Sequence, residues 1–161
     1  MTFQPEDLRE MMRSWTSGVV LVTSQFEGRR HGMTVSSFTS VALDPPLVLV
    51  CIDTSSRTHD LIVNSGAFAA AVLAEDQRDI SDRFAGRQGE FDDRFESLQV
   101  ITTPTGCPVP AGSLAYVDCR VSATYAGGHS SIFLGEVTEA KVLRQDSPLV
   151  YHDQHYHRLA D

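Results

Sequence analysis

Alternating apolar and polar positions predict two long, half-buried strands in the last third of the chain. Between residues 115 and 125, small or apolar side chains occupy every second position, and mostly polar side chains lie between them. This two-residue period is typical of a strand with one buried face. Gly127 and Gly128 predict a turn, and residues 131–143 predict the returning strand. Gly135, within that strand, predicts a bulge or a close approach of another backbone.

Shorter runs rich in β-branched and apolar residues predict the remaining strands. They cover residues 18–24, 47–52, 67–73 and a short pair within 148–159. The sequence Asp44-Pro45-Pro46 interrupts the chain before the second run, because proline cannot donate to a strand ladder. Residues 47–52 are apolar at every position, which indicates a strand in a barrel that is also covered on its outer face.

Three short helices are also expected, one before the first strand and two between strands. In the first, Leu8, Met11, Met12 and Trp15 fall at helical spacing. The second begins after a serine N-cap at position 55 or 56 and stops at Gly66, and the third covers residues 76–84. Residues 86–110 contain three prolines and no periodic pattern, so most of them are expected to be loop. The pattern predicts a mainly β fold, a barrel with helical covers, rather than a parallel α/β sheet.

The composition is that of a globular protein, and residues 1–161 are expected to form a single domain. A formal net charge of −8 argues against nucleic acid or an anionic membrane as partner, since both attract basic surfaces. No stretch approaches the ~20 apolar residues of a membrane span, and the N-terminus lacks the features of a signal peptide. Cys51, Cys107 and Cys119 are odd in number and form no CxxC pair, which argues against disulfides and a cysteine zinc site. We therefore expect a cytoplasmic protein.

The sequence Ser55-Ser56-Arg57-Thr58 is a candidate phosphate site. It lies at a predicted helix start directly after a predicted strand, where free backbone N–H groups and the helix dipole favour an anion. Arg57 can bind a phosphate through two N–H donors at once. The alternative is an ordinary capped helix with a solvated arginine.

The stretch GMTVSSFTS, residues 32–40, carries hydroxyl groups at five of its nine positions. Along an extended chain, Thr34 and Ser36 point one way while Val35 and Ser37 point the other. Such a strand can line the edge of a flat, polar heterocycle, although an edge strand with ordinary surface serines is the alternative. Together with the phosphate site about twenty residues later, it favours a nucleotide-like cofactor such as a flavin over a bare anion.

A histidine and two tyrosines near predicted turns are further candidates. His129 lies at a predicted hairpin tip, where it can donate a hydrogen bond or a proton near neutral pH, or have no task. Tyr151 and Tyr156 fit either a barrel rim or a stacking contact with a ring. Cys51 lies in an apolar run and fits a buried small side chain better than a nucleophile.

Three histidines near the C-terminus raise the possibility of a metal or haem site. They are His152, His155 and His157, of which the last two would share one face of a strand. No carboxylate or cysteine completes a recognisable ligand set, so surface histidines are favoured and no metal is expected. The sequence also contains no Rossmann glycine pattern and no P-loop.

Three segments, in order, resemble the flavin reductase-like family, the small flavin:NAD(P)H reductases that serve two-component monooxygenases. They are GMTVSSFTSVALDPPLVLVCIDTSSRTH, GCPVPAGSLAYVDCRVSATYAGGHSSIFLGEV and PLVYHDQHYHRL, and the similarity extends roughly from Met12 to Leu159. The resemblance implies an FMN-binding split β-barrel of Greek-key type that works as a homodimer. It also implies an NAD(P)H:flavin oxidoreductase.

The resemblance further implies which residues meet the cofactor. These are Thr34, Val35, Ser36 and Ser37 at the isoalloxazine ring, Cys51, Ile52 and Asp53 along the ribityl chain, Ser56, Arg57 and Thr58 at the phosphate, and Phe84 and Tyr151 close by. The residue implied in nicotinamide binding and hydride transfer is His129. Two positions depart from the family pattern: Ser36 stands where asparagine is common, and Gly128 where aspartate is frequent.

The resulting hypothesis is a reductase that passes a hydride from NADH or NADPH to FMN or FAD. Reduced flavin would then serve a partner monooxygenase. The alternative hypothesis is a flavoprotein that holds FMN permanently, as an electron carrier or sensor. The two differ in whether flavin turns over and leaves the protein.

Overall fold

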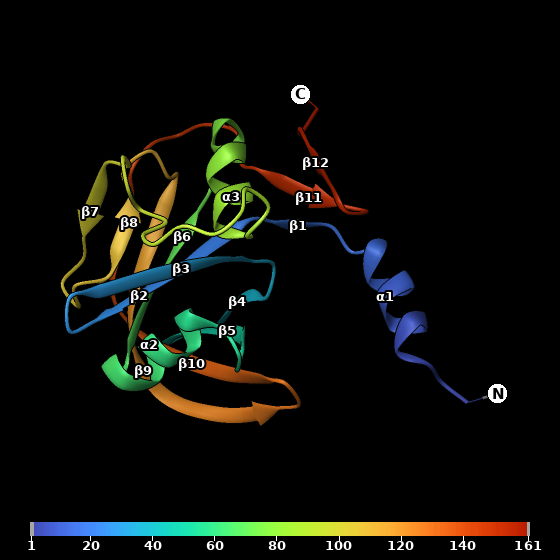
Figure 1. Cartoon of the computed structure of the whole chain (residues 1–161), viewed down its shortest axis with the longest axis horizontal. Helices are drawn as coiled ribbons and strands as arrows, with labels where there is room; N and C mark the ends of the chain where they lie inside the picture. The colour runs from blue at the N-terminus through green and yellow to red at the C-terminus, as the bar shows by residue number, and fades with distance from the viewer. Residues whose placement is uncertain (1, 161) are drawn as a thin grey trace.

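Seven antiparallel strands form the main sheet of the computed structural model, which describes residues 2–160 (Figure 1). Their bounds are β2 Val20–Phe26, β3 Arg29–Val35, β4 Phe38–Leu43, β5 Pro46–Asp53, β6 Ala67–Val72, β9 Ala115–Gly127 and β10 Ser130–Val142. The order across the sheet is β3, β2, β6, β9, β10, β5, β4. The mainly β fold with short helices, predicted from the sequence, is confirmed.

Two small sheets and three short helices complete the structure. One sheet contains β1 Ser17–Gly18, β11 Val150–His152 and β12 His155–His157, and the other contains β7 Val100–Thr102 and β8 Pro108–Pro110. The helices are α1 Pro5–Arg13, α2 Arg57–Ser65 and α3 Arg78–Phe84, and a 3₁₀ turn, η1 Glu75–Gln77, precedes α3. Within residues 2–160, no helix is long and apolar enough to cross a membrane.

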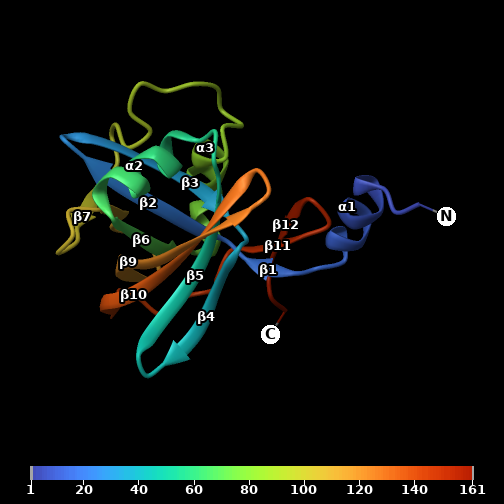
Figure 2. The same cartoon turned by 90° about the horizontal axis from the view of Figure 1, so that it is seen from below.

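The main sheet does not close on itself, and its two outer strands are neighbours in sequence. β3 and β4 are separated along the chain only by Ser36 and Ser37. An outer strand leaves one row of backbone N–H and C=O groups without a strand partner. Both α2 and α3 contact β3 (Figure 2). The opening of the sheet therefore lies at the hydroxyl-rich segment.

The central strands are buried on both faces by two separate apolar clusters. Along β2, Leu21 packs in a cluster with Phe84, whereas Val20 and Val22 pack in a second cluster with Phe68. Successive side chains of a strand point to opposite faces. The continuous apolar run of β2 follows from this double burial, as is usual for strands covered on both sides.

The long hairpin predicted for the last third of the chain is present. β9 and β10 pair along their whole length, and their register shifts between Leu134 and Gly135. A Cβ atom added at Gly135 would lie 2.6 Å from Cζ of the buried Phe68. The bulge predicted at this glycine is confirmed, whereas the close neighbours are side chains and not another backbone.

Two strand predictions need correction. The strand expected at residues 18–24 is divided at Val19, whose N–H donates to the Leu149 carbonyl, so β1 and β2 belong to different sheets. Residues 86–110 contain β7 and β8 in addition to loop. Cys107 and Val109 are buried in the core, so this segment packs against the rest of the chain. The prolines of β8 are tolerated because β8 pairs with β7 alone, so its other edge needs no backbone N–H donors.

β5 is covered less completely than its sequence predicts. Val48, Val50 and Ile52 are buried, but the alternate side chains Leu47, Leu49 and Cys51 are only half-buried. The apolar outer face of this strand is therefore open in the single chain.

α1 lies apart from the main sheet (Figures 1 and 2). None of its residues is buried, and its predicted apolar face is exposed, with Leu8, Met11 and Met12 on the helix and Trp15 just beyond it. The predicted helix is confirmed, and its apolar face meets water in the single chain.

Candidate functional site

A groove runs beside the outer strand β3, from β11 to the N-terminus of α2. It consists of two adjoining cavities that share Thr34 and Ala85. The tyrosine cavity, of about 180 Å³, is lined by Tyr151 and Tyr156 among others. The arginine cavity, of about 380 Å³, is lined by residues that include Arg57 and Arg94. A long ligand can therefore occupy both cavities at once.

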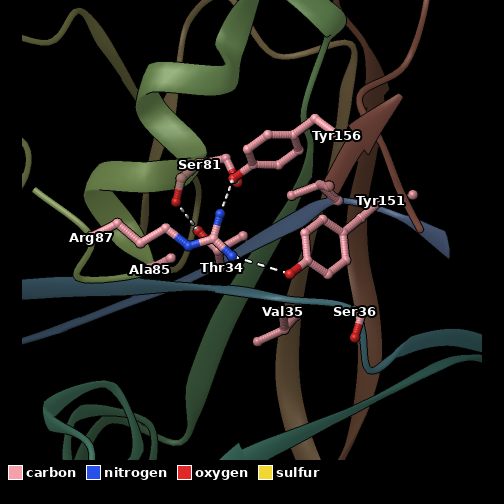
Figure 3. Close-up of a pocket in the computed structure, with 10 residues that line it drawn as sticks. Thr34, Val35, Ser36, Ser81, Ala85, Arg87, Tyr151 and Tyr156 are labelled. Carbon is pink, nitrogen blue, oxygen red and sulfur yellow. Dashed lines mark hydrogen bonds between the residues drawn. The ribbon is translucent and has the colours of Figure 1, made fainter. Parts of the chain in front are cut away.

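The wall of the tyrosine cavity is a polar cluster centred on Arg87 (Figure 3). Its Nη2 donates to the Tyr151 hydroxyl at 3.1 Å, and its Nη1 donates to Asp82 Oδ1 at 3.0 Å. The Tyr156 hydroxyl donates to the same carboxylate oxygen at 2.7 Å. Burial raises the pKa of Tyr156, so its hydroxyl remains protonated. The cavity thus offers aromatic faces, a cation and hydroxyl groups to a planar polar ligand.

Three of the residues predicted at a flavin ring line this cavity from the end of β3 and the position after it (Figure 3). They are Thr34, Val35 and Ser36. Thr34 Oγ1 donates to the Ser81 carbonyl at 2.8 Å, which fixes α3 against the strand. The fourth predicted residue, Ser37, is engaged elsewhere: its hydroxyl donates to the Cys51 carbonyl at 2.9 Å and accepts from the Cys51 N–H at 3.1 Å. It links the start of β4 to β5.

The arginine cavity contains the N-terminus of α2. Ser56 is the N-cap, and its hydroxyl accepts from the His59 N–H at 3.1 Å. The first amides of a helix have no partner within the helix. The N–H groups of Arg57 and Thr58 donate to no acceptor among residues 2–160. The Arg57 amide and the positive end of the helix dipole therefore face this part of the groove.

Arg94 is a buried cation beside these amides. Only 9% of the residue is exposed, and its Nη1 donates to the carbonyls of Gly32 and Phe84 at 3.2 and 3.0 Å. Its Nε has no partner, and Arg94 takes part in none of the ion pairs formed within the described residues. Burial, followed by the charge of Arg57, lowers the pKa of Arg94. A buried guanidinium without a carboxylate is costly unless an anion joins it.

His31 adds a second unpartnered buried group. Its Nδ1 shares a hydrogen bond of 2.8 Å with Thr58 Oγ1, while its Nε2 has no partner among residues 2–160. Burial, then the charges of Arg94 and Arg57, lowers the pKa of His31 to about 4. The neutral ring can offer an N–H at Nε2. The Thr58 hydroxyl is engaged with His31, and Thr58 is completely buried and lines neither cavity.

Arg57 is held loosely at the rim of the arginine cavity. Its Nη2 pairs with Glu90 Oε2 at 3.1 Å, and both side chains are more than half exposed. Exposed pairs of this kind contribute little stability, about 0–1 kcal/mol. The guanidinium can therefore exchange Glu90 for a phosphate.

The predicted ribityl-chain residues lie where β5 ends. Ile52 is fully buried in the core, and Cys51 is half-buried beside Ser37. Asp53 is exposed, and hydrogen bonds from the Ser55 hydroxyl and N–H lower its pKa. None of the three lines either cavity.

His129 lies at the tip of the β9–β10 hairpin and is exposed. Its carbonyl accepts from the N–H and hydroxyl of Thr54 at 2.9 and 3.1 Å, which places the tip beside the start of α2. The next residue, Ser130, pairs with Asp53 of β5. A carboxylate from another strand therefore lies near His129, although Gly128 replaces the aspartate common in the family.

Phe84, the remaining residue predicted near the cofactor, is buried and lines the arginine cavity. Arg94 and His31 were missed by the sequence reasoning. Arg94 lies in a segment without periodicity and carried no signal. His31 precedes the hydroxyl-rich segment on the same strand, so extending the strand pattern by one residue would have included it.

The C-terminal histidines do not gather around a common point. His152 Nδ1 bonds to Thr16 Oγ1 at 2.9 Å, and the ring nitrogens of His155 and His157 meet backbone carbonyls. Within the described residues, no group of three or more His, Cys, Asp or Glu side chains could hold a metal ion.

The fold places a groove with tyrosines at one end and arginines at the other beside the open edge of a β-sheet. A family model described as flavin reductase like domain matches residues 12–160. The chain belongs to this family, as its sequence motifs predicted. The sequence motifs also implied a flavin oxidoreductase, and named relatives belong to this enzyme class.

Three proteins illustrate the similarity. The actinorhodin polyketide dimerase of Streptomyces coelicolor is 37% identical over 153 residues, which cover 94% of this chain and 85% of that protein. The reductase subunit HsaB of a flavin-dependent monooxygenase from Rhodococcus jostii is 32% identical, with 94% and 76% covered. The solved structure of the NADH:FAD oxidoreductase SgcE6 of Streptomyces globisporus has a TM-score of 0.89 at 32% identity, with 100% and 92% covered.

Proposed function

We propose that the groove binds a flavin nucleotide, FMN or FAD, and that the chain uses NADH or NADPH to reduce it for a partner monooxygenase. One observation carries the proposal: a buried arginine that forms no ion pair within residues 2–160 lies at one end of a groove whose other end is walled by tyrosines. Relatives support it, since one is named a monooxygenase reductase subunit and another an NADH:FAD oxidoreductase. When bound, the flavin supplies the hydride-accepting chemistry, and the protein supplies binding and orientation.

The phosphate end is the arginine cavity. Arg57 and the start of α2 would hold the phosphate, with Arg94 beside them. Ser56 would support this end as the N-cap, since its hydroxyl and N–H both donate to the Asp53 carbonyl. The orphaned Nε of Arg94 and Nε2 of His31 support the fit, because buried polar atoms normally have a partner. Arg57→Ala should weaken flavin affinity, and an unaltered dissociation constant would remove this assignment.

The ring end is the tyrosine cavity. Thr34 and Val35 lie at the end of β3, an outer strand without a second strand neighbour in residues 2–160, and Ser36 follows them. Tyr151 and Arg87 close the opposite wall. These residues would orient a flat ring and exclude water from one side of it.

His129 is proposed to orient the nicotinamide from the rim, with Asp53 near it. The variant His129→Ala should lower turnover while the dissociation constant for flavin stays close to that of the wild type. Unchanged steady-state rates in this variant would refute the role.

The function itself is tested by following NADH and NADPH oxidation with purified protein, with and without added FMN or FAD. Rapid oxidation that depends on free flavin supports a reductase that releases its product. Absence of oxidation, together with flavin that stays bound on dilution, would instead support the electron carrier or sensor.

We also propose a homodimer, formed through the open apolar faces. On the outer face of the sheet, Cys51 of β5 pairs with Ile132 of β10, and Leu49 pairs with Leu134. These half-buried side chains form one apolar surface, and contiguous surfaces of this kind mark interfaces. Light scattering should give twice the chain mass for the wild type and a lower mass for Leu134→Glu. A monomeric wild type would refute the dimer.

A cytoplasmic location and a single functional domain over residues 1–161 complete the proposal. Cys51, Cys107 and Cys119 are all free thiols, as suits a reducing compartment.

A further inference from the structure

One carboxylate reaches the arginine cavity, and it comes from the loop that follows α3. Glu90 lines this cavity together with Arg57 and Arg94, and no other aspartate or glutamate of residues 2–160 lines it. Its Oε2 accepts from Arg57 Nη2 at 3.1 Å, the one hydrogen bond that the Glu90 side chain forms in the described part of the chain. Glu90 is therefore the counter-ion that the protein itself supplies to the proposed phosphate site.

The pair between Arg57 and Glu90 is weaker than a neighbouring pair of the same kind. The Glu90 side chain is 84% exposed and lies outside any helix or strand, so water can replace Arg57 around it at little cost. Arg30, by contrast, binds Asp93 through two nitrogens, with Nε and Nη2 at 3.1 and 2.6 Å from Oδ2. Arg30 is thus fixed by its carboxylate, whereas Arg57 remains available to a stronger anion.

Glu90 occupies the nitrogen of Arg57 that a phosphate needs. A guanidinium binds an anion in two-pronged fashion along one edge, either through Nε and Nη2 or through Nη1 and Nη2. Nη2 belongs to both edges, and it is the atom that donates to Glu90. A phosphate on either edge with Glu90 still in place would put two anions on one nitrogen, where like charges repel. Phosphate binding to Arg57 is therefore coupled to the departure of Glu90.

The same carboxylate acts on Arg94. Burial, followed by the charge of Arg57, lowers the pKa of Arg94, and the charge of Glu90 opposes this decrease. A phosphate monoester carries a charge of about −1.5 to −2 near pH 7, which two free arginines would balance. Glu90 thus reduces by one unit the positive charge that this cavity offers to a phosphate.

We propose that Glu90 competes with the phosphate of the flavin for Arg57, and so keeps flavin binding weaker than the two arginines alone would make it. The inference rests on the proposed function. Glu90 moves into solvent when a flavin phosphate binds, and it returns to Arg57 as the flavin leaves. This exchange favours release of the product to a partner. A flavin without a phosphate is not subject to the competition.

The test compares dissociation constants for FMN and riboflavin, measured by quenching of flavin fluorescence without NAD(P)H. Glu90→Gln should tighten FMN binding about three- to fivefold, the upper range for an exposed ion pair, and leave the riboflavin constant unchanged. Glu90→Lys adds a cation and should tighten FMN binding about tenfold. Glu96→Gln and Glu96→Lys make the same charge changes at an exposed position of the same loop, outside both cavities, and should keep the wild-type constants.

The Arg57→Ala background separates competition for Arg57 from a charge effect at a distance. In that background, Glu90→Gln should no longer tighten FMN binding, and an equal gain would overturn the inference. A gain shared by riboflavin would overturn it too. If Arg57→Ala weakens FMN binding while Glu90→Gln has no effect, only the competition is refuted. If the wild type binds no flavin at all, the proposed function fails and the competition fails with it. Glu90 is exposed, so its variants should keep the wild-type melting temperature, which thermal unfolding checks.

Discussion

The contact between Gly135 and Phe68 gives a sharp test of the core. In Gly135→Ala, the new methyl group would lie 2.6 Å from Phe68 Cζ, 2.8 Å from Phe68 Cε1 and 2.9 Å from the Cβ of Cys119. Ordinary contacts between carbon atoms are about 3.5–4.0 Å. The neighbours must therefore move by roughly 1 Å, although Phe68 is completely buried.

Overpacking of this kind typically costs about 1–3 kcal/mol of unfolding free energy. For a chain of this size, each kcal/mol lowers the melting temperature by about 2–4 °C, so a decrease of roughly 2–12 °C is expected. Gly18→Ala is the matched control, because nothing lies within 4 Å of its added Cβ. Its melting temperature should stay close to that of the wild type.

Calorimetry or circular dichroism would measure both melting temperatures, and the smaller side chain in Phe68→Leu supplies a second check. Phe68→Leu should destabilise the wild type but partly relieve Gly135→Ala, giving a favourable coupling energy in a double-mutant cycle. An unchanged melting temperature for Gly135→Ala, or strictly additive effects, would refute the proposed contact.

Three further predictions concern buried polar groups. The pKa of His31 is about 4 in the folded chain and near 6.5 in the unfolded chain. The free energy of unfolding should therefore be highest above pH 6.5 and fall by up to about 3 kcal/mol toward pH 4. Urea unfolding should show this pH dependence, and His31→Asn should remove it. Thr58→Val leaves His31 Nδ1 unpartnered and should cost about 1–3 kcal/mol in the same assay, while Thr58→Ser should cost less. Asp118 accepts hydrogen bonds from Thr103 and Thr105, so Asp118→Ala should lower the melting temperature more than Asp118→Asn.

Local patterns accounted for those parts of the structure that depend on neighbouring residues. The β9–β10 hairpin follows from strict alternation and a double glycine, and the start and end of α2 follow from Ser56 and Gly66. Gly66 has a φ of 67°, the left-handed conformation that glycine adopts most easily at a helix end. Each of these features is specified within a few residues.

Long-range contacts accounted for what the sequence did not reveal. Arg94 donates to the Gly32 carbonyl of β3, 62 residues before it, and to the Phe84 carbonyl at the end of α3, so nothing directly around Arg94 in the sequence marks it as buried. Asp53 comes near His129 only because β5 pairs with β10. The open outer face of β5 is likewise invisible in a run of uniformly apolar residues.

The two outer strands of the sheet differ in how well they resist addition of foreign strands during folding. β3 is partly covered, because α3 contacts it and Arg94 donates a hydrogen bond to its Gly32 carbonyl. β4 instead ends at Leu43, which is 89% exposed, and carries an exposed Val41. Unprotected strand edges are where chains aggregate. Misassembly of newly made chains is therefore expected to begin at β4, and a solubilising charge would be most useful there.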